Sequence, residues 1–212
     1  MAQLLVLHHA LGLTRGVRSL ARAWEDAGHQ VSLPDFYDGH TFTDVASGVD
    51  YARSVGFDVI SGLGEDAASD LSPGFVVVGM SLGVIPALRI GMGNDAVAAV
   101  IAAGSCLDQE FLGGPWPSKL PLRILASEGD SDFINDGDLA AAQALVAAGG
   151  DVKLRLLPGN EHLFMEAFDP ASVAATDALY ELVLRYLSRA DEAGPSPDPD
   201  DDAPEPWEDE LL

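Results

Sequence analysis

Short apolar runs and longer amphipathic stretches alternate along this chain. Most of the apolar runs are rich in Val, Leu and Ile and lack the alternating polar positions of a sheet with one solvent-exposed face. Strands of this kind are typical of a parallel sheet that is covered on both faces. We predict six of them, at Leu4–Leu7, His29–Leu33, Phe75–Val78, Val97–Ala103, Leu122–Ala126 and Val152–Leu157.

Helical spacing fills most of the segments between these runs. In the first segment apolar residues recur at helical intervals from Val17 to Trp24, between a capping Thr14 and a stop at Gly28. Further helices are expected at 44–69, Leu82–Met92, Asp138–Ala148 and Ala171–Leu187, with a loop over Gly104–Pro121. The last helix should turn Val173, Leu179, Leu182, Val183 and Leu187 towards the core.

This alternation predicts an α/β fold. Right-handed crossovers between parallel strands give a three-layer sandwich, here with a mainly parallel sheet of about six strands flanked by helices. In open sheets of this class the chemistry lies outside the C-terminal ends of the strands. Candidate functional residues are therefore sought just after each predicted strand.

The composition changes sharply near Ala190. Residues 190–212 hold ten of the 34 acidic residues and five of the 13 prolines, with almost nothing apolar. Such a segment buries too little surface to offset the entropy of ordering it. We therefore predict one folded domain at 1–189 and an acidic, Pro-rich disordered tail at 190–212, in which Trp207 and Leu211-Leu212 are the only apolar anchors.

Charge and cysteine content narrow the classes of partner. A net charge of −23 opposes binding to phosphate backbones, so no nucleic-acid partner is expected. A single cysteine, Cys106, excludes an internal disulfide and favours a reducing, cytoplasmic compartment. The opening residues do not predict a signal peptide, and no apolar run is long enough to span a bilayer, so no membrane partner is expected.

One motif carries specific chemistry. The sequence Gly79-Met80-Ser81-Leu82-Gly83 matches G-x-S-x-G and lies between a predicted strand and a predicted helix. That is the context of the nucleophile elbow of α/β-hydrolases, in which a sharp turn lifts the serine above the sheet. Ser81 is thus the candidate nucleophile, and the N–H of Leu82 a candidate oxyanion donor. The alternative is a tight turn whose serine only caps the helix.

A base and an acid follow two later strands. His162 comes after the last predicted strand, on the same side of the sheet as Ser81. In α/β-hydrolases the acid lies between serine and histidine in the sequence, which points to the segment after Leu122–Ala126. Asp130 is preferred there because Gly129 permits a tight turn, with Glu128 and Asp132 as competing candidates.

The loop after the first strand should supply the second oxyanion N–H. Its sequence is His8-His9-Ala10-Leu11-Gly12, and Ala10 is the first choice, followed by Leu11. A metal shared by His8 and His9 is not expected, because adjacent strand residues point to opposite faces. Cys106 is expected to be a small buried residue. Arg15 and Arg18 are explained equally well as contacts for an anionic group and as solvated helix positions.

These pieces together resemble the dienelactone hydrolase family of α/β-hydrolases. The resemblance rests on residues 8–14, 34–37, the elbow, Gly129-Asp130 and residues 158–164, and it covers about residues 3–188. It implies a catalytic Ser81, Asp130 and His162, with backbone donors at Ala10 and Leu82. It also places Tyr37 near the substrate. The remaining residues expected to contact substrate are His9, Leu11, Met80, Trp116 and Phe164, with Phe36 and Phe133 as further wall candidates.

The chain departs from that family at positions that determine its substrate. Dienelactone-cleaving members use a cysteine at the elbow, a glutamate in the first loop and arginines for the substrate carboxylate, one of them shortly after the catalytic histidine. Here Ser81 and His9 occupy the first two places, and the four residues after His162 include no arginine. The expected function is a serine hydrolase cleaving a small ester, lactone or thioester, as a monomer or dimer, without metal or organic cofactor. The alternative is a non-catalytic small-molecule binding protein on the same fold.

Overall fold

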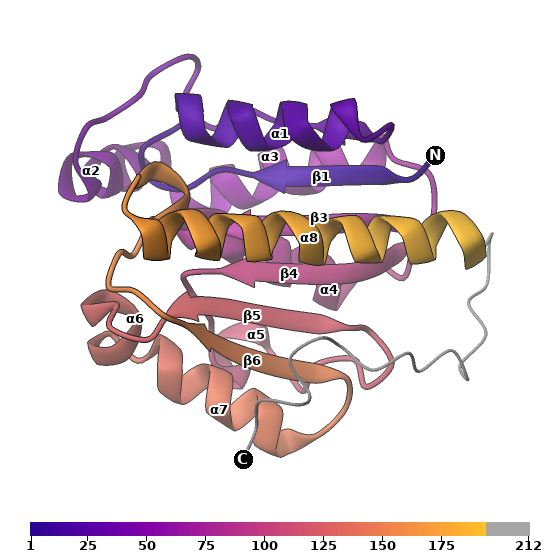
Figure 1. Cartoon of the computed structure of the whole chain (residues 1–212). Coiled ribbons are helices and arrows are strands. Elements are labelled where there is room, and N and C mark those ends of the chain that lie inside the picture. Colours follow the sequence, from indigo (N-terminus) through magenta and orange to yellow (C-terminus); the bar gives the residue numbers. More distant parts are fainter. Residues whose placement is uncertain (194–212) are drawn as a thin grey trace.

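Six parallel strands form one continuous sheet in the computed structural model, which describes residues 1–193 (Figure 1). The strands are β1 (Gln3–Leu7), β2 (Gln30–Ser32), β3 (Phe75–Met80), β4 (Val97–Ala103), β5 (Leu122–Ser127) and β6 (Val152–Leu157). Their order across the sheet is β2-β1-β3-β4-β5-β6. All pairings are parallel, so the C-terminal ends of the strands share one edge.

Two helical layers cover the sheet. Helices α1 (Arg15–Asp26) and α8 (Pro170–Ala193) lie on the near face in Figure 1. The opposite face is covered by α2 (Val45–Val55), α3 (Phe57–Ser69), α4 (Val84–Gly93) and α7 (Asp138–Ala148). Successive residues of a strand enter different layers: Val76 and Val78 pack with α1 and α8, whereas Val77 packs with the other four helices. This double burial explains why the strands read as unbroken apolar runs.

The six predicted strands and the α/β architecture are confirmed, with end points that differ by at most two residues. The first helix is also confirmed. The Thr14 side chain accepts a hydrogen bond from the Val17 N–H, and Gly28 has a φ of 97°, which suits the stop after a helix.

Four local predictions are corrected by the structure. The expected helix over 44–69 is two helices, because Gly56 adopts a φ of 98° that breaks the run. Two short helices were missed, α5 (Gln109–Leu112) and α6 (Ser131–Asn135), since one turn gives little periodicity. Val173 is 44% exposed and not part of the core stripe of α8.

The last helix extends to Ala193, past the expected domain boundary at Ala190. Most of the predicted acidic tail, from residue 194 onward, lies outside the described residues. No helix within residues 1–193 is both long enough and apolar enough to cross a membrane.

Candidate active site

Ser81 sits at a strained turn between β3 and α4. The turn is a 3-10 segment (Ser81–Gly83). The backbone φ angle of Ser81 is 48°, a value that residues other than glycine rarely adopt. Both flanking positions must be glycine, because a Cβ atom at either one would clash with a backbone carbonyl oxygen. A Cβ at Gly79 would lie 2.4 Å from the Gly83 carbonyl oxygen, and one at Gly83 would lie 2.1 Å from the Leu7 carbonyl oxygen. The motif therefore encodes the geometry that raises Ser81 above the edge of the sheet.

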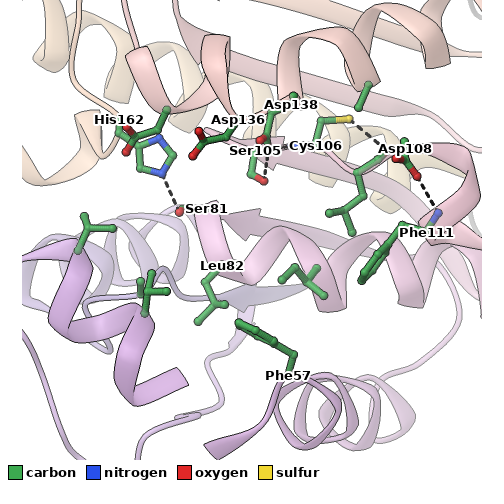
Figure 2. Close-up of a pocket in the computed structure, with 18 residues that line it drawn as sticks. Phe57, Ser81, Leu82, Ser105, Cys106, Asp108, Phe111, Asp136, Asp138 and His162 are labelled. Carbon is green, nitrogen blue, oxygen red and sulfur yellow. Dashed lines mark hydrogen bonds between the residues drawn. The ribbon is translucent and has the colours of Figure 1, made fainter. Parts of the chain in front are cut away.

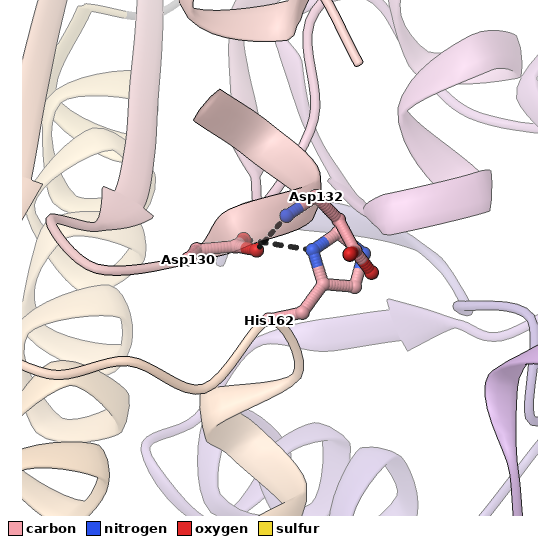
Figure 3. Close-up of side chains that lie close together, drawn as sticks. All are labelled: Asp130, Asp132 and His162. Atoms are coloured by element: carbon pink, nitrogen blue, oxygen red, sulfur yellow. Dashed lines mark hydrogen bonds and ion pairs between the residues drawn. The ribbon is translucent and has the colours of Figure 1, made fainter. Parts of the chain in front are cut away.

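Three side chains from three strand ends form one hydrogen-bonded chain. Ser81 Oγ is 2.8 Å from His162 Nε2, and His162 Nδ1 is 2.7 Å from Asp130 Oδ2 (Figures 2 and 3). Asp130 follows β5 and His162 follows β6, so the parallel topology brings both to the edge where Ser81 lies. The imidazole lies between hydroxyl and carboxylate.

Asp130 is held by its own helix. It caps α6, and its Oδ1 accepts hydrogen bonds from the backbone N–H groups of Asp132 and Phe133 at 3.0 and 3.2 Å. The carboxyl is almost completely buried. Among the three candidate acids, Asp130 is the one whose carboxylate is hydrogen-bonded to the His162 imidazole. The Glu128 side chain is exposed, and Asp132 lines the neighbouring cavity.

The environment favours a protonated His162. Burial alone would lower the pKa of the imidazole, but the hydrogen bond to Asp130 and the charge of Asp130 outweigh it, with Asp132 and Asp138 adding to them. The net result is a pKa for His162 above its ordinary value of 6.5. An imidazole that gains a proton readily is suited to act as a base towards Ser81.

Asp130, Asp132 and His162 also have the donor types of a metal site. Their ligand atoms lie within 4.8 Å of one another (Figure 3). However, Asp130 Oδ2 and His162 Nδ1 are hydrogen-bonded to each other, and His162 Nε2 is within hydrogen-bonding distance of Ser81 Oγ. The hydrogen-bonded chain thus already engages the atoms that a cation would need.

The two expected backbone donors lie at the cavity beside Ser81. Ala10 and Leu82 both line it. In the loop after β1, the Leu11 N–H donates to His9 Nδ1 at 3.3 Å and the Gly12 N–H donates to the His9 carbonyl at 3.0 Å. Between the two alternatives from the sequence, the engagement of Leu11 leaves Ala10 as the candidate oxyanion donor of this loop.

Ser81 opens into a cavity of about 430 Å³ with two different sides (Figure 2). One side is apolar and comes from α2, α3, the Ser81–Gly83 turn, α4 and α5: Val45, Val49, Phe57, Leu82, Ile85 and Phe111. The other side carries four carboxyl groups, Asp108, Asp132, Asp136 and Asp138. Within residues 1–193, the residues that line this cavity include no Lys or Arg.

None of the six residues expected to contact substrate lines this cavity, and their contact with substrate stays a prediction. They are His9, Leu11, Tyr37, Met80, Trp116 and Phe164. Tyr37 is buried in an aromatic cluster and donates its hydroxyl to the Gly48 carbonyl; burial raises its pKa to about 12. Met80 and Phe164 are completely buried, and Trp116 lines a separate cavity together with Leu145.

The sequence does not identify the residues that form the apolar wall, because no motif marks them. The sequence predicts a helical segment over 44–69, but it does not show that Val45, Val49 and Phe57 line the cavity beside Ser81. Phe111 was assigned to a loop. The further aromatic candidates Phe36 and Phe133 are buried in the core.

The polar residues near the site have distinct roles. Cys106 lines the cavity but is buried, and burial raises its thiol pKa to about 12, so it is not a thiolate nucleophile. His8 accepts from the Phe36 N–H and donates to the His9 carbonyl, and burial lowers its pKa to about 4. His9 points instead to Glu166, so the two histidines do not converge, as expected. Arg18 binds the Leu13 carbonyl.

Comparisons with known proteins place the fold. No protein-family model and no curated protein matches the sequence. Among solved structures, a dienelactone hydrolase-like promiscuous phosphotriesterase from metagenomic libraries is similar, at 17% identity, 88% coverage of this chain, 87% of that chain and a TM-score of 0.64. A dienelactone hydrolase from Anabaena variabilis shares 16% identity over 88% and 87% of the two chains, with a TM-score of 0.62.

A cold-adapted esterase from an Arctic intertidal metagenomic library is also similar, at 16% identity over 85% of this chain and 82% of that one, with a TM-score of 0.59. Together these likenesses show the α/β-hydrolase fold. They confirm, at the level of the fold, the resemblance to dienelactone hydrolases that the sequence motifs indicated.

Proposed function

We propose that the protein is a serine hydrolase that cleaves a small ester, lactone or thioester. The observation that carries this proposal is the unbroken chain from Ser81 Oγ through His162 to a buried Asp130, at the wall of a cavity. Such a chain lets a neutral hydroxyl lose its proton as it attacks a carbonyl. The esterases and dienelactone hydrolases of the same fold support it by analogy.

The geometry supports a two-step reaction. In the first step His162 Nε2 takes the Ser81 proton while Oγ bonds to the acyl carbon, and the carbonyl oxygen becomes an oxyanion near the Ala10 and Leu82 N–H groups. The carbon–leaving-group bond then breaks, and His162 gives its proton to the departing oxygen or sulfur. In the second step His162 takes a proton from a water molecule that attacks the acyl carbon. The bond between that carbon and Oγ then breaks, Ser81 Oγ receives the proton from His162, and the carboxylic acid leaves.

Asp130 acts on His162 and not on the substrate. Its hydrogen bond fixes the tautomer that carries a proton on Nδ1, which leaves Nε2 free to accept. It also stabilises the imidazolium that forms in each step. This division of roles needs no metal or organic cofactor.

The cavity favours substrates without negative charge. Its carboxyl groups repel an anionic substituent, and among the residues that line it within 1–193 there is no cation to bind one. The apolar wall suits a short hydrocarbon acyl chain. We therefore propose neutral esters in place of the carboxylate-bearing lactones that the resemblance would suggest.

The test is the variant Ser81→Ala. Hydrolysis of p-nitrophenyl butyrate should fall by at least about 10⁴-fold, because the nucleophile is lost, while the melting temperature and circular dichroism stay those of the wild type. Unchanged turnover would overturn the assignment. A non-catalytic binding protein remains the second candidate only if the wild type itself shows no turnover across short esters, lactones and thioesters.

A further inference from the structure

Outside the cavity, a buried polar pair joins the two loops that the reaction needs. His9 Nε2 lies 3.1 Å from Glu166 Oε1. His9 belongs to the loop after β1 and is completely buried; Glu166 belongs to the 3-10 turn (Phe164–Glu166) and its side chain is 22% exposed. Neither side chain lines the cavity, and the proposed reaction does not use either of them.

The hydrogen bonds of His9 fix its tautomer. The Leu11 N–H donates to Nδ1, so Nδ1 carries no proton, and Nε2 therefore donates to Glu166. The His9 imidazole thus binds the backbone N–H directly after Ala10 and connects this loop to the 3-10 turn that carries Glu166. The Gly12 N–H bonds to the His9 carbonyl and closes the same turn.

Glu166 is built into this position. It accepts a second hydrogen bond from Thr14 Oγ1 at 2.5 Å, and Thr14 in turn caps α1. Gly16 allows the approach, because a Cβ there would lie 2.3 Å from Glu166 Oε1. Burial raises the pKa of Glu166, but the hydrogen bonds from His9 and Thr14 outweigh this and lower it, so the group stays a carboxylate.

Glu166 is also tied to the catalytic-histidine loop. It lies four residues after His162, and its N–H bonds to the Leu163 carbonyl at 2.8 Å. The pair therefore connects the segment that carries the base with the segment that carries the Ala10 N–H. An oxyanion donor works only at the distance where the charge develops, and misplacing one donor costs about 10²–10³-fold in rate.

We propose that His9 and Glu166 are positioning residues, which hold the Ala10 N–H at the oxyanion position relative to Ser81 and His162. This inference rests on the proposed serine-hydrolase function. The competing interpretation is that the pair only stabilises the fold, as any satisfied buried pair does.

Two substitutions of each residue separate the contacts. Glu166→Ala removes both hydrogen bonds, whereas Glu166→Gln keeps an oxygen acceptor for them. His9→Asn places an oxygen near the Nδ1 position and keeps the Leu11 contact, and His9→Gln places an amide near the Nε2 position and keeps the Glu166 contact. Glu181→Ala, an exposed carboxyl on α8, is the control.

The experiment measures p-nitrophenyl butyrate kinetics and inhibition by a trifluoromethyl ketone, well below each melting temperature. We expect Glu166→Ala to lower kcat about 10–100-fold with KM within about threefold, and to weaken the inhibitor by the same factor, because both depend on the oxyanion site. Glu166→Gln should recover most of kcat, each His9 variant should lose an intermediate amount, and Glu181→Ala should match the wild type.

Several results would overturn the proposal. If Glu166→Ala melts earlier but keeps its kcat and inhibitor affinity, the pair is only structural. If Glu166→Ala does not fold, the two His9 variants decide, and wild-type kcat and inhibitor affinity in folded His9→Asn and His9→Gln overturn the proposal equally. A wild type that neither turns over esters nor reacts at Ser81 with a fluorophosphonate refutes the proposed function itself, which is a distinct outcome.

Discussion

At the scale of the residue, the elbow shows how far chemistry can be predicted from spacing. Ser81, His162 and Asp130 were identified because each follows a strand whose apolar run is unmistakable, and parallel strands end at one edge. The choice of Asp130 over Asp132 required a distance, since both lie on the same turn. The apolar wall could not be predicted from the sequence. Residues such as Phe57 line the cavity because of where their helix lies in the fold, and no sequence motif indicates that position.

The glycines of the elbow give the first prediction. Gly83→Ala should lower the free energy of unfolding by about 1–3 kcal/mol, since its Cβ would meet the Leu7 carbonyl, and should also impair turnover. Gly93→Ala, at the exposed C-terminal end of α4 with nothing within 4 Å of the added Cβ, should be neutral or stabilising by up to about 1 kcal/mol. Urea unfolding measures both. Equal effects would show that close contact at the elbow is not what selects glycine.

The raised pKa of His162 gives the second prediction. Nε2 must be unprotonated to accept the Ser81 proton, so kcat/KM should fall as pH decreases through the pKa of His162, with a midpoint above 6.5. In Asp130→Asn the raising charge is gone while burial remains, so the midpoint should move to lower pH and kcat should fall about 10³–10⁴-fold. A pH profile of both proteins decides. A midpoint that stays in place would show that Asp130 does not tune the imidazole.

At the scale of the element, strands were easier to predict than helices. The four inner strands, β1, β3, β4 and β5, are buried on both faces, so their composition alone marks them. Helix ends depend on single backbone conformations, such as the positive φ of Gly56 that separates α2 from α3. That break matters for the site, because α2 and α3 separately supply Val49 and Phe57 to the apolar wall.

The apolar wall gives the third prediction. Phe57→Ala should lower the ratio of kcat/KM for p-nitrophenyl hexanoate over acetate by about 3–10-fold, because the longer chain loses its apolar contact. Phe168→Ala, which removes an aromatic ring that is 93% exposed and outside the cavity, is the control. If both variants keep the wild-type ratio, the acyl chain does not lie against α3.

At the scale of the whole molecule, the net charge of −23 acts on the site as well as on the surface. The composition predicts a negative electrostatic potential, but it does not show that several carboxyl groups lie together at the cavity. Topology brings Asp132 and Asp138, after β5, beside Asp108, after β4, on one side of one cavity. That placement follows from the strand order and could not be inferred from composition.

The acidic side of the cavity gives the fourth prediction. At low salt, kcat/KM for p-nitrophenyl butyrate should exceed that for the p-nitrophenyl monoester of succinate, which has similar length and one carboxylate, by at least about tenfold. Salt should narrow the gap by raising only the value for the anion. Asp136→Asn should also narrow the difference in kcat/KM between the two esters, by raising the value for the anionic ester. Equal rates for the two esters at low salt would contradict an electrostatic preference.

The central claim is that Ser81 is an activated nucleophile. Incubation with a fluorophosphonate, followed by mass mapping of the peptides, measures this most directly. We predict a single adduct on Ser81 in the wild type, no adduct at that position in Ser81→Ala, and much slower labelling in His162→Gln. A wild type whose Ser81 stays unmodified while its fold is intact would contradict the account.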